Sequence, residues 1–477
     1  MTKSGRFSSE YLSRLLAPLN ARKLWVACSG GVDSMTLLHA LATRRDLFPM
    51  PIGAIHVNHH WHRDAGNMES LVRKSAETWG AQFIAVSIDQ PPVHRGGLEA
   101  VSRKLRYQGM ASHLAAGEVL LTAHHANDQL ETMLLALLRG SGLQGLRGMV
   151  HGPRPFGLGQ LMRPLLQFSR AELLRYASAL AVPWFEDPTN RDLSRARNYL
   201  RHTVISRIEE RWPGACQSAD VSACFLEESF AFLDHRLEHE TSSVWNPCWN
   251  GLIVEALRKL PESGLRLLLR RWIRVHHHSA STLSRTQMES LMHVIRKEPQ
   301  TRHASFALKE CEIVLYAGHL FLVPALPEPR VRSTPVTWDP DTRHWHLWPG
   351  WGTLYLTEGS PTTLLGRDAS AWHISLRSGG EQMAWHRNAG HHPLKEIFRS
   401  ERVPPWMRNR IPLVFAGTEL VAAGDWFCHP DLLEGRLGSD ERPLVWEPDH
   451  ADLLYEKQRY DDFLSSPRAH GRIPPPH

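Results

Sequence analysis

Two adjacent glycines near the N-terminus are flanked by hydroxyl and carboxylate side chains in a pattern suited to holding phosphate. The segment Ser29-Gly30-Gly31-Val32-Asp33-Ser34 follows a short apolar run, and a helical pattern begins within it. Adjacent glycines permit a tight turn whose N–H groups approach an anion, and the following helix adds its positive N-terminal end. Ser29 and Ser34 can donate hydroxyl hydrogens, and Asp33 can hold a magnesium ion that bridges phosphate oxygens. The segment therefore predicts a phosphate-binding loop.

Imidazoles and guanidiniums gather at two further places. The segment His56-Val57-Asn58-His59-His60 ends an apolar run, and its imidazoles could bind a metal ion or form a polar turn. Arg103 and Arg106 are three residues apart in a predicted helix, so they share one face. That face could clamp a phosphate, although a solvated helix face shows the same pattern.

His124 and His125 follow another apolar run, and Asp128 lies just beyond them. Asp128 and Glu131 are three residues apart before an apolar stripe, which is the spacing of a capping box. A cap would explain both acids without catalysis, but it leaves two histidines at the expected edge of a sheet. The glycine-rich segment that begins at Arg139 is suited to close approach of the backbone to a ligand.

Apolar runs and helical stripes alternate through the first 140 residues. Strands are expected at 24–28, 52–57, 83–88 and 119–123, and helices at 34–42, 68–79, 98–105 and 130–138. Such alternation predicts βαβ units and a parallel sheet covered on both faces. Ligands bind beyond the carboxyl ends of these strands, where the candidate residues lie. The sequence therefore predicts an α/β fold with an N-terminal doubly wound parallel sheet.

The pattern changes after about residue 215. The expected divisions are a catalytic domain at 1–215, a mostly helical middle domain at 216–330, a linker and the start of the C-terminal unit at 331–370, a small β-rich C-terminal domain at 371–450, and a tail at 451–477. Residues 465–477 are expected to be disordered.

Composition excludes several classes of protein. With 42% apolar and 22% charged residues, the chain is neither disordered nor fibrous. Six widely spaced cysteines without a CxxC pair signal neither a zinc ribbon nor an iron–sulfur cluster. We expect a cytoplasmic protein without membrane contact, because no apolar stretch resembles a signal or spanning segment. The net charge of +6, with basic runs at 191–211 and 258–274, slightly favours a polyanionic partner.

The phosphate loop is not of the Walker type, because the lysine of GK[ST] is missing. A lysine-free SGG-x-DS loop resembles the PP-loop of ATP pyrophosphatases, which hold the β- and γ-phosphates as leaving pyrophosphate. That resemblance implies transfer of AMP to a carbonyl-type oxygen and displacement of AMP by a nucleophile.

Several motifs occur together and in a fixed order. They are SGGVDS at 29–34, HVNHH at 56–60, EAVSRKLRY at 99–107, TAHHANDQLET at 122–132, RGSGLQGL at 139–146, RPL at 163–165 and EDPTN at 186–190, with LKEIF at 394–398 and VPPW at 403–406 in the last third. In this order they resemble the tRNA(Ile)-lysidine synthetase family, closely over 20–215 and again near the C-terminus. Trp61-His62 departs from the expected family pattern.

The resemblance implies a reaction in two steps. ATP adenylates the C2 oxygen of the wobble cytidine of tRNA(Ile) with a CAU anticodon, and the amine of free L-lysine then expels AMP to give lysidine. The codon read changes from AUG to AUA. ATP, Mg²⁺, this tRNA and lysine are the expected ligands and partners, and a homodimer is left open.

The resemblance also implies roles for particular residues. The implied ATP-binding residues are Ser29, Gly30, Gly31, Val32, Asp33, Ser34 and His56, with Asp33 as the magnesium ligand. Arg103 or Arg106 would stabilise charge on the α-phosphate. His124 or His125, together with Asp128, would face the adenylated base and the incoming lysine.

The implied tRNA-binding residues lie in both halves of the chain. They are Arg139, Asn190, Arg195, Arg197, Arg201, Lys395, Arg399 and Arg402. The segment 190–211 would read phosphates of the anticodon stem, and Phe398 and Trp406 could add aromatic rings to the C-terminal cations or could simply be core residues.

Three rival interpretations follow from the same motifs. A tRNA 2-thiolation enzyme of the same fold would usually carry paired cysteines, which are absent. A PP-loop amidotransferase would need a glutaminase with a cysteine nucleophile. A non-catalytic tRNA-binding protein would have little use for an intact phosphate loop.

Overall fold

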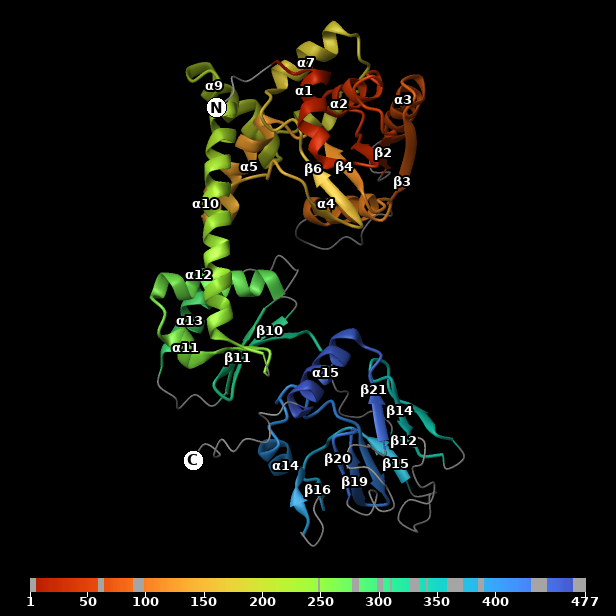
Figure 1. The fold of residues 1–477 in the computed structure, drawn as a ribbon, viewed down its shortest axis with the longest axis vertical. Coiled ribbons are helices and arrows are strands. Elements are labelled where there is room, and N and C mark those ends of the chain that lie inside the picture. The colour runs from red at the N-terminus through yellow and green to blue at the C-terminus, as the bar shows by residue number, and fades with distance from the viewer. Residues whose placement is uncertain are drawn as a thin grey trace. The chain divides into compact units, whose positions relative to one another are not determined.

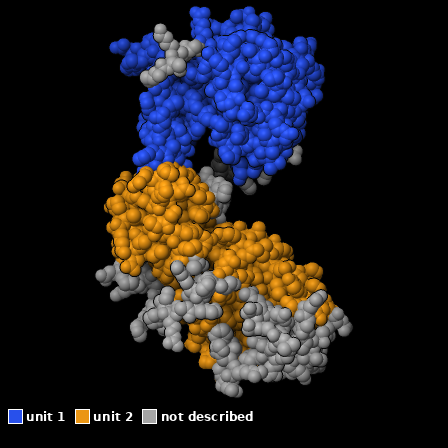
Figure 2. Space-filling view, in the orientation of Figure 1, with its two compact units in different colours: residues 1–233 blue, residues 234–477 orange. Residues whose placement is uncertain are grey.

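The computed structural model describes residues 6–58, 64–88, 98–247, 249–276, 283–297, 303–308, 311–326, 335–339, 342–357, 372–384, 390–429 and 444–465. The chain forms two compact units, 1–233 and 234–477, shown in Figure 2. The division falls within α10 (Ala215–Val244), whereas the sequence pattern predicts the end of the first domain at residue 215. Each unit is described by itself below.

The first unit is built on a six-stranded sheet (Figure 1). Its strands, in spatial order, are β3 (Gln82–Ser87), β2 (Ile52–Asn58), β1 (Lys23–Ala27), β4 (Glu118–Thr122), β6 (Gly159–Met162) and β5 (Arg154–Phe156). All neighbours are parallel except β5 and β6. Ala27 at the end of β1 is level with Ile55 of β2 and Thr122 of β4, so the segments that follow these strands leave from one edge. The predicted parallel sheet is confirmed.

Helices cover both faces of this sheet. Successive side chains of a strand point to opposite faces, and apolar side chains of β1 lie on both. Leu24 of β1 packs in a core with Leu37 and Leu173, whereas Trp25 packs in a second core with Met110. The helices on the first face are α1 (Ser9–Leu16), α2 (Val32–Ala42), α3 (Ala65–Thr78) and α7 (Arg170–Ala179), and the second face is covered by α4 (Leu98–Ala111). The sheet is therefore doubly wound, as expected.

A group of helices, formed by the segment after β4 and the segments after α7, completes the first unit. It consists of α5 (Ala126–Leu138), α6 (Leu143–Leu146), the 3₁₀ turn η2 (Pro188–Arg191), α8 (Ala196–Tyr199), the π-helical turn η3 (Leu200–Ile205), α9 (Ser206–Arg211) and the start of α10. Ala126 of α5, Ile205 and Cys216 are buried together. This small core fixes α5 against the segments that follow η2.

The second unit begins with helices and an antiparallel sheet. The helices are α11 (Val254–Arg258), α12 (Glu262–His276) and α13 (Arg285–Arg296), and the sheet has the order β7 (Trp245–Asn246), β8 (Gly251–Ile253), β11 (His319–Pro324), β10 (Cys311–Tyr316) and β9 (His303–Ala307). The hairpin of β10 and β11 matches the strand-like runs in the sequence. The short β7 and β8 were not predicted, so the middle region holds more sheet than expected.

The rest of the second unit is rich in strands. One sheet contains β12 (Val336–Thr337), β15 (Trp372–Ser375), β18 (Leu413–Ala416), β19 (Glu419–Ala423) and β20 (Phe427–Cys428); another contains β13 (His344–His346), β14 (Thr353–Leu356) and β21 (Leu444–Glu447); β16 (Gln382–Met383) pairs with β17 (His392–Pro393). The helices are α14 (Leu394–Ser400) and α15 (Ala451–Ser465). Leu453 and Tyr460 of α15 are buried in this core, although the sequence analysis predicted no helix there.

The described helices include none that is both long and apolar enough to cross a membrane. The predicted disorder of 465–477 falls almost wholly outside the described residues.

Candidate active site

The phosphate loop connects β1 to α2 and keeps its shape largely through its own bonds. Gly30 has φ +87°, a conformation that side-chain-bearing residues rarely adopt, so the glycine is required here. The hydroxyl of Ser34 accepts from the Ser29 N–H at 3.2 Å and donates to the Gly31 carbonyl at 3.0 Å. The Phe185 N–H donates to the Gly30 carbonyl at 2.9 Å. The Ser34 hydroxyl was expected to face phosphate, but in this structure its proton serves the loop.

Asp33 lies in the first turn of α2, directly after the buried Val32. Its Oδ2 is 3.6 Å from Nε2 of His125, whereas its Oδ1 is buried without a hydrogen-bond partner. A buried carboxylate oxygen without a donor is costly unless a cation or another donor binds it. Asp33 therefore presents a single unsatisfied acceptor within the phosphate loop.

His125 is the N-cap of α5. Its ring Nδ1 accepts from the backbone N–H of Asp128 at 3.4 Å. The backbone N–H of His125 in turn donates to Asp128 Oδ2 at 3.0 Å, which closes a capping box. The spacing of Asp128 and Glu131 predicted a possible cap one turn later, and that placement was wrong because the helix begins at Ala126. With Nδ1 used as an acceptor, the ring proton sits on Nε2, between Asp33 and Asp128.

Arg201 balances the acids of α5. Its Nε donates to Glu131 Oε1 at 2.7 Å, and its Nη2 donates to Asp128 Oδ1 at 3.1 Å. Glu131 is fully buried, and burial raises its pKa although Arg201 pulls the other way. Arg201 was expected to contact tRNA phosphates, yet its guanidinium is engaged by these carboxylates, which compete directly with a phosphate.

His124 differs from its neighbour in both surroundings and protonation. Its Nδ1 is 2.9 Å from the Thr122 hydroxyl. Burial lowers the pKa of His124 to about 3; Asp128 opposes this shift, while Arg163, Arg103 and Arg197 add to it. The imidazole is therefore neutral at physiological pH.

A cavity of about 400 Å³ opens at the ends of β1, β2 and β4. Its lining includes Ser29, Gly31, Asp33 and Ser34 of the phosphate loop, His56 of β2, Arg103 and Arg106 of α4, His124 after β4 and Asp187 before η2. Both arginine candidates line it, so the geometry retains both. His124 lines the cavity, but His125 and Asp128 are not among its lining residues. The two histidines thus separate into one that faces the cavity and one that braces Asp33.

Guanidiniums from α4 and from the segment after β6 give this part of the first unit a positive charge. Arg103 lies over the ring of Tyr107 at 5.3 Å. Arg163, which follows β6, is only 3% exposed, and its pKa is lowered to about 10 by burial and then by neighbouring Arg154. A buried guanidinium whose pKa is depressed by another cation favours binding of an anion nearby.

His56 and Asn58 terminate β2 at the same edge. His56 is buried, and its Nδ1 is 2.8 Å from the Cys28 carbonyl, to which it donates. Burial lowers the pKa of His56. Asn58 donates to Glu69 of α3 at 2.9 Å. His56 thus braces the start of the phosphate loop; His59 and His60 lie outside the described residues, as does Trp61-His62.

The predicted tRNA-binding residues of the first unit have varied surroundings. Arg139 caps the C-terminus of α5 and is exposed. Arg195 is exposed, with Nε 3.5 Å from Asp192 Oδ2, and Arg197 is half-buried. The side chain of Asn190 is outside what the structure describes. Arg139 and Arg195 are the residues of this group that are open to a large ligand.

The C-terminal cations lie on and after α14. Lys395 and Arg399 are exposed, whereas Arg402 is half-buried with φ +58°. Phe398 is fully buried, and Trp406 is buried with its Nε1 donating to Glu456 at 2.8 Å. The two aromatic rings therefore belong to the core, so of the two alternatives left open for Phe398 and Trp406 the packing role is confirmed.

Some cavity residues escaped the sequence analysis. Phe185 fixes the phosphate loop only through its backbone N–H, which leaves no signature in residue type. Tyr107 and Asp187, which line the cavity, and the buried Arg163 lay within motifs but received no role. The available signals were the start of a helical turn for Asp187, the end of a strand for Arg163 and the neighbouring Arg106 for Tyr107.

Comparison with known proteins agrees with this geometry. Residues 6–208 match the family model of a PP-loop domain, residues 252–321 that of a TilS substrate binding domain, and residues 373–436 that of a TilS substrate C-terminal domain. These three segments contain the phosphate loop, strand β10 with the start of β11, and the cations of α14, respectively.

Full-length relatives match nearly end to end. The tRNA(Ile)-lysidine synthase of Alkalilimnicola ehrlichii is 34% identical over 431 residues, covering 88% of this chain and 94% of the relative. The enzyme of the same name from Xanthomonas campestris pv. campestris is 35% identical, covering 84% and 89%. That of Pseudomonas aeruginosa is 34% identical, covering 92% and 96%. With its phosphate loop, cationic cavity and these relatives, the chain belongs to the tRNA(Ile)-lysidine synthase family.

Proposed function

We propose that this protein is an AMP-forming ligase that makes lysidine in tRNA(Ile) with a CAU anticodon. The C2 oxygen of the wobble cytidine attacks the α-phosphorus of ATP, and pyrophosphate leaves. The lysine amine then forms a C–N bond at C2 as the C–O bond to AMP breaks and the amine loses its proton. The observation that carries the proposal is the single cavity into which the phosphate loop, Arg103, Arg106 and His124 all open.

The phosphate loop supplies the site for the leaving group. Its glycine backbone and the N-terminal end of α2 favour the charge of pyrophosphate. Asp33 fits a Mg²⁺ ligand, because its Oδ1 is a buried carboxylate oxygen without a partner. A bound Mg²⁺ would neutralise phosphate charge there, while His125 keeps the other oxygen of Asp33 in place.

Arg103 and Arg106 are placed to stabilise negative charge on the α-phosphate. Preorganised cations in a partly buried site do this without reorganisation during the reaction. Arg103 is the stronger candidate, because its charge also acts on the cavity-facing His124.

His124 and Asp128 are suited to the second step. A neutral His124 does not repel an incoming lysine ammonium, and its Nδ1 bond to Thr122 leaves Nε2 for a substrate. The charge of Asp128 acts on His124, so this carboxylate can attract the ammonium electrostatically. Only the neutral amine attacks, and the neighbouring guanidiniums favour loss of its proton.

Binding of tRNA requires cations beyond this cavity. Lys395 and Arg399 on α14 and the exposed Arg139 and Arg195 of the first unit are the proposed phosphate contacts. The proposal also includes a cytoplasmic location; a homodimer is a separate prediction that sedimentation of the full chain would test.

The decisive experiment measures incorporation of radiolabelled lysine into a transcript of tRNA(Ile) with a CAU anticodon, with ATP and Mg²⁺. Methionine tRNA and a sample without ATP are the controls. Label should enter the isoleucine transcript alone and should be lost in Asp33→Ala but not in Asp46→Ala, whose carboxylate is exposed. Folded protein that neither incorporates label nor releases pyrophosphate would overturn the proposal.

A thiolation reaction is the alternative, and one observation weighs against it. Burial raises the pKa of Cys28, the cysteine beside the phosphate loop, to about 11, so its thiol is protonated at neutral pH. Pyrophosphate release that depends on tRNA but not on lysine, together with incorporation of labelled sulfur, would favour this alternative.

A further inference from the structure

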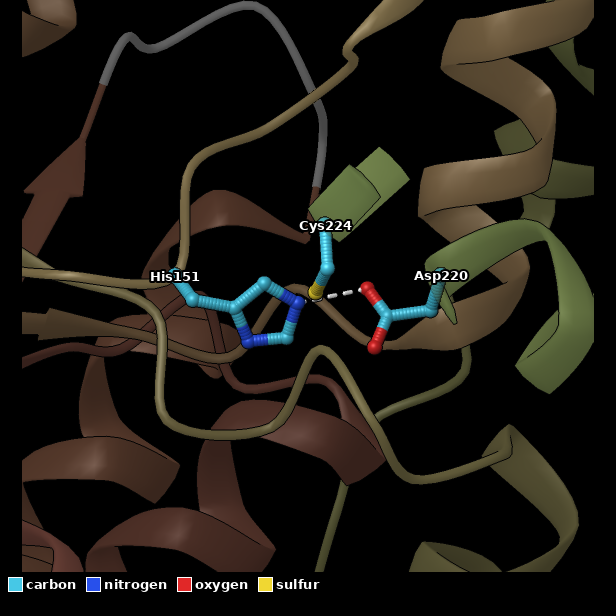
Figure 3. Close-up of side chains that lie close together, drawn as sticks. All are labelled: His151, Asp220 and Cys224. Atoms are coloured by element: carbon cyan, nitrogen blue, oxygen red, sulfur yellow. Dashed lines mark hydrogen bonds and ion pairs between the residues drawn. The ribbon is translucent and has the colours of Figure 1, made fainter. Parts of the chain in front are cut away.

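Three side chains outside the active site offer a nitrogen, an oxygen and a sulfur atom to a common point. His151 lies in the segment between α6 and β5, and Asp220 and Cys224 lie on α10 (Figure 3). Their ligand atoms are all within 4.8 Å of one another, and His151 Nε2 is 2.7 Å from Asp220 Oδ1. Among the described residues, this is the one such group of three.

The backbone presents these groups without strain on the helix. Asp220 and Cys224 are four residues apart on α10 and therefore share one face. Asp220 is 4% exposed, whereas His151 and Cys224 are half-buried. The cluster is thus anchored by a buried carboxylate and reachable from solvent by a small ion.

A second layer of hydrogen bonds holds the cluster in position. The side chain of Gln129, fully buried on α5, donates to the Met149 carbonyl at 2.9 Å and accepts from the Met149 N–H at 2.7 Å. The same Nε2 lies 3.4 Å from Asp220 Oδ1. Partners of this kind fix the orientation of metal ligands and strengthen binding.

The surroundings favour a cation. The carboxylates of Asp220, Glu227 and Glu228 act on the sulfur of Cys224, so the field there is negative. Glu227 is neutralised by Arg147 at 2.6 Å, an ion pair that ties the same segment to α10 one turn later. Among the ion pairs of the described residues, Asp220 is paired with His151 and with no lysine or arginine.

We propose that His151, Asp220 and Cys224 bind a divalent transition-metal ion, with Zn²⁺ as the preferred ion. Imidazole, carboxylate and thiolate are the ligands that Zn²⁺ takes in tetrahedral sites, and a water molecule would complete the four. Bond lengths of about 2.0–2.3 Å require ligand atoms about 3.3–3.8 Å apart. Side-chain rotation that opens the 2.7 Å contact between His151 and Asp220 is sufficient.

The ion would fasten three elements of the first unit. His151 belongs to the connection after α6, the two other ligands belong to α10, and Gln129 links both to α5. Because α5 also carries Asp128, metal binding would stiffen the helix that borders the active site. His151, Asp220 and Cys224 are not among the residues that line the cavity at the strand ends, so the metal proposal does not depend on the proposed lysidine reaction.

The test uses the full chain without a histidine tag, stripped of metal and titrated with Co²⁺. We expect one tight equivalent whose spectrum shows tetrahedral Co²⁺ with a thiolate-to-metal charge-transfer band, and displacement of Co²⁺ by Zn²⁺. Cys224→Ser should remove the charge-transfer band, and His151→Ala should weaken binding by more than the roughly 10–100-fold expected for loss of an outer partner. Cys428→Ser, a half-buried thiol in β20, is the matched control and should leave the spectrum unchanged.

Two further measurements guard against trivial results. Zn²⁺ should raise the melting temperature of the wild-type chain and of Cys428→Ser but not of Cys224→Ser, and hydrogen exchange in α10 should slow in the same proteins. Binding without a thiolate band, or a band that survives in Cys224→Ser, would mean an adventitious ion only and would overturn the proposal. Absence of a tight equivalent in folded wild-type protein would also overturn it.

Discussion

Replacing Arg201 by methionine should destabilise the first unit, because Arg201 is the cation that compensates two acids of α5. Its Nε and Nη2 contact Glu131 and Asp128 at 2.7 and 3.1 Å, and Glu131 is fully buried. Removing one partner of a buried ion pair costs about 3–5 kcal/mol. The Arg201 side chain is 26% exposed, so the lower end, about 3 kcal/mol, is expected. That is about a 100-fold change in the unfolding equilibrium.

The pH dependence gives this prediction its sign. Burial raises the pKa of Glu131 in the folded state, and loss of Arg201 would raise it further. A raised carboxyl pKa penalises the ionised folded form, and the penalty is fully present above the folded pKa and absent below the unfolded value. The pKa of Asp128, which His125, His124 and Arg201 lower against the effect of burial, would rise as well, so stability that Asp128 supplies at neutral pH would be lost. Arg201→Met should therefore cost most at about pH 8 and progressively less toward about pH 5.

The assay is pulsed hydrogen exchange of α5 peptides across a urea series, which reports on the first unit alone. The double variant Arg201→Met with Glu131→Gln should recover about 1–2 kcal/mol, because the uncompensated charge is gone. The ion-pair reasoning would be refuted if Arg201→Met were as stable as wild type at about pH 8. It would also be refuted if the variant lost the same unfolding free energy at about pH 8 and at about pH 5. Weaker tRNA binding with unchanged stability would restore the phosphate-contact role predicted from sequence.

Four other outcomes are expected. Asp33→Asn should reduce tRNA-dependent pyrophosphate release at least about 100-fold while the protein stays folded, as circular dichroism would check; full release would contradict the role of its carboxylate. His124, whose pKa burial lowers to about 3, should stay neutral between about pH 5 and pH 8, and an NMR titration of its ring within that range would oppose the assignment. Lys395→Ala and Arg399→Ala should each reduce the salt dependence of tRNA binding by about one unit of slope without lowering the melting temperature. Phe398→Ala should instead cost about 3–5 kcal/mol of stability, measured by urea unfolding, because its ring is fully buried.

The sheet and its phosphate loop could be predicted because their signals are local. An apolar run, two glycines and a helical stripe follow one another directly along the chain from β1 into α2. The strands β2, β3 and β4 are likewise each followed along the chain by a helical stripe, namely α3, α4 and α5. Placement of the candidate residues at one edge then follows from parallel topology.

The partners of the charged residues could not be predicted, because they depend on contacts between distant segments. Arg201 and Glu131 are 70 positions apart, and nothing in the basic run around Arg201 shows that it meets acids rather than phosphates. Phe398 and Trp406 lie within a run of cations in the sequence, yet packing turns both rings into the core. Trp338 and Trp345 stack with ring centroids 3.7 Å apart inside the same core, which explains part of the tryptophan content of this region.

Because His125 both caps α5 and contacts Asp33, a kinetic measurement on His125→Ala would confuse two effects. The alanine would remove a contact to the phosphate loop and would also leave the first turn of α5 without its cap, which costs about 1 kcal/mol in typical helices. His125→Asn separates the two, since asparagine is among the best N-cap residues but is too short to take over the Nε2 contact to Asp33. The difference between the two variants would measure how far fraying of one helix end, rather than lost chemistry, limits the rate.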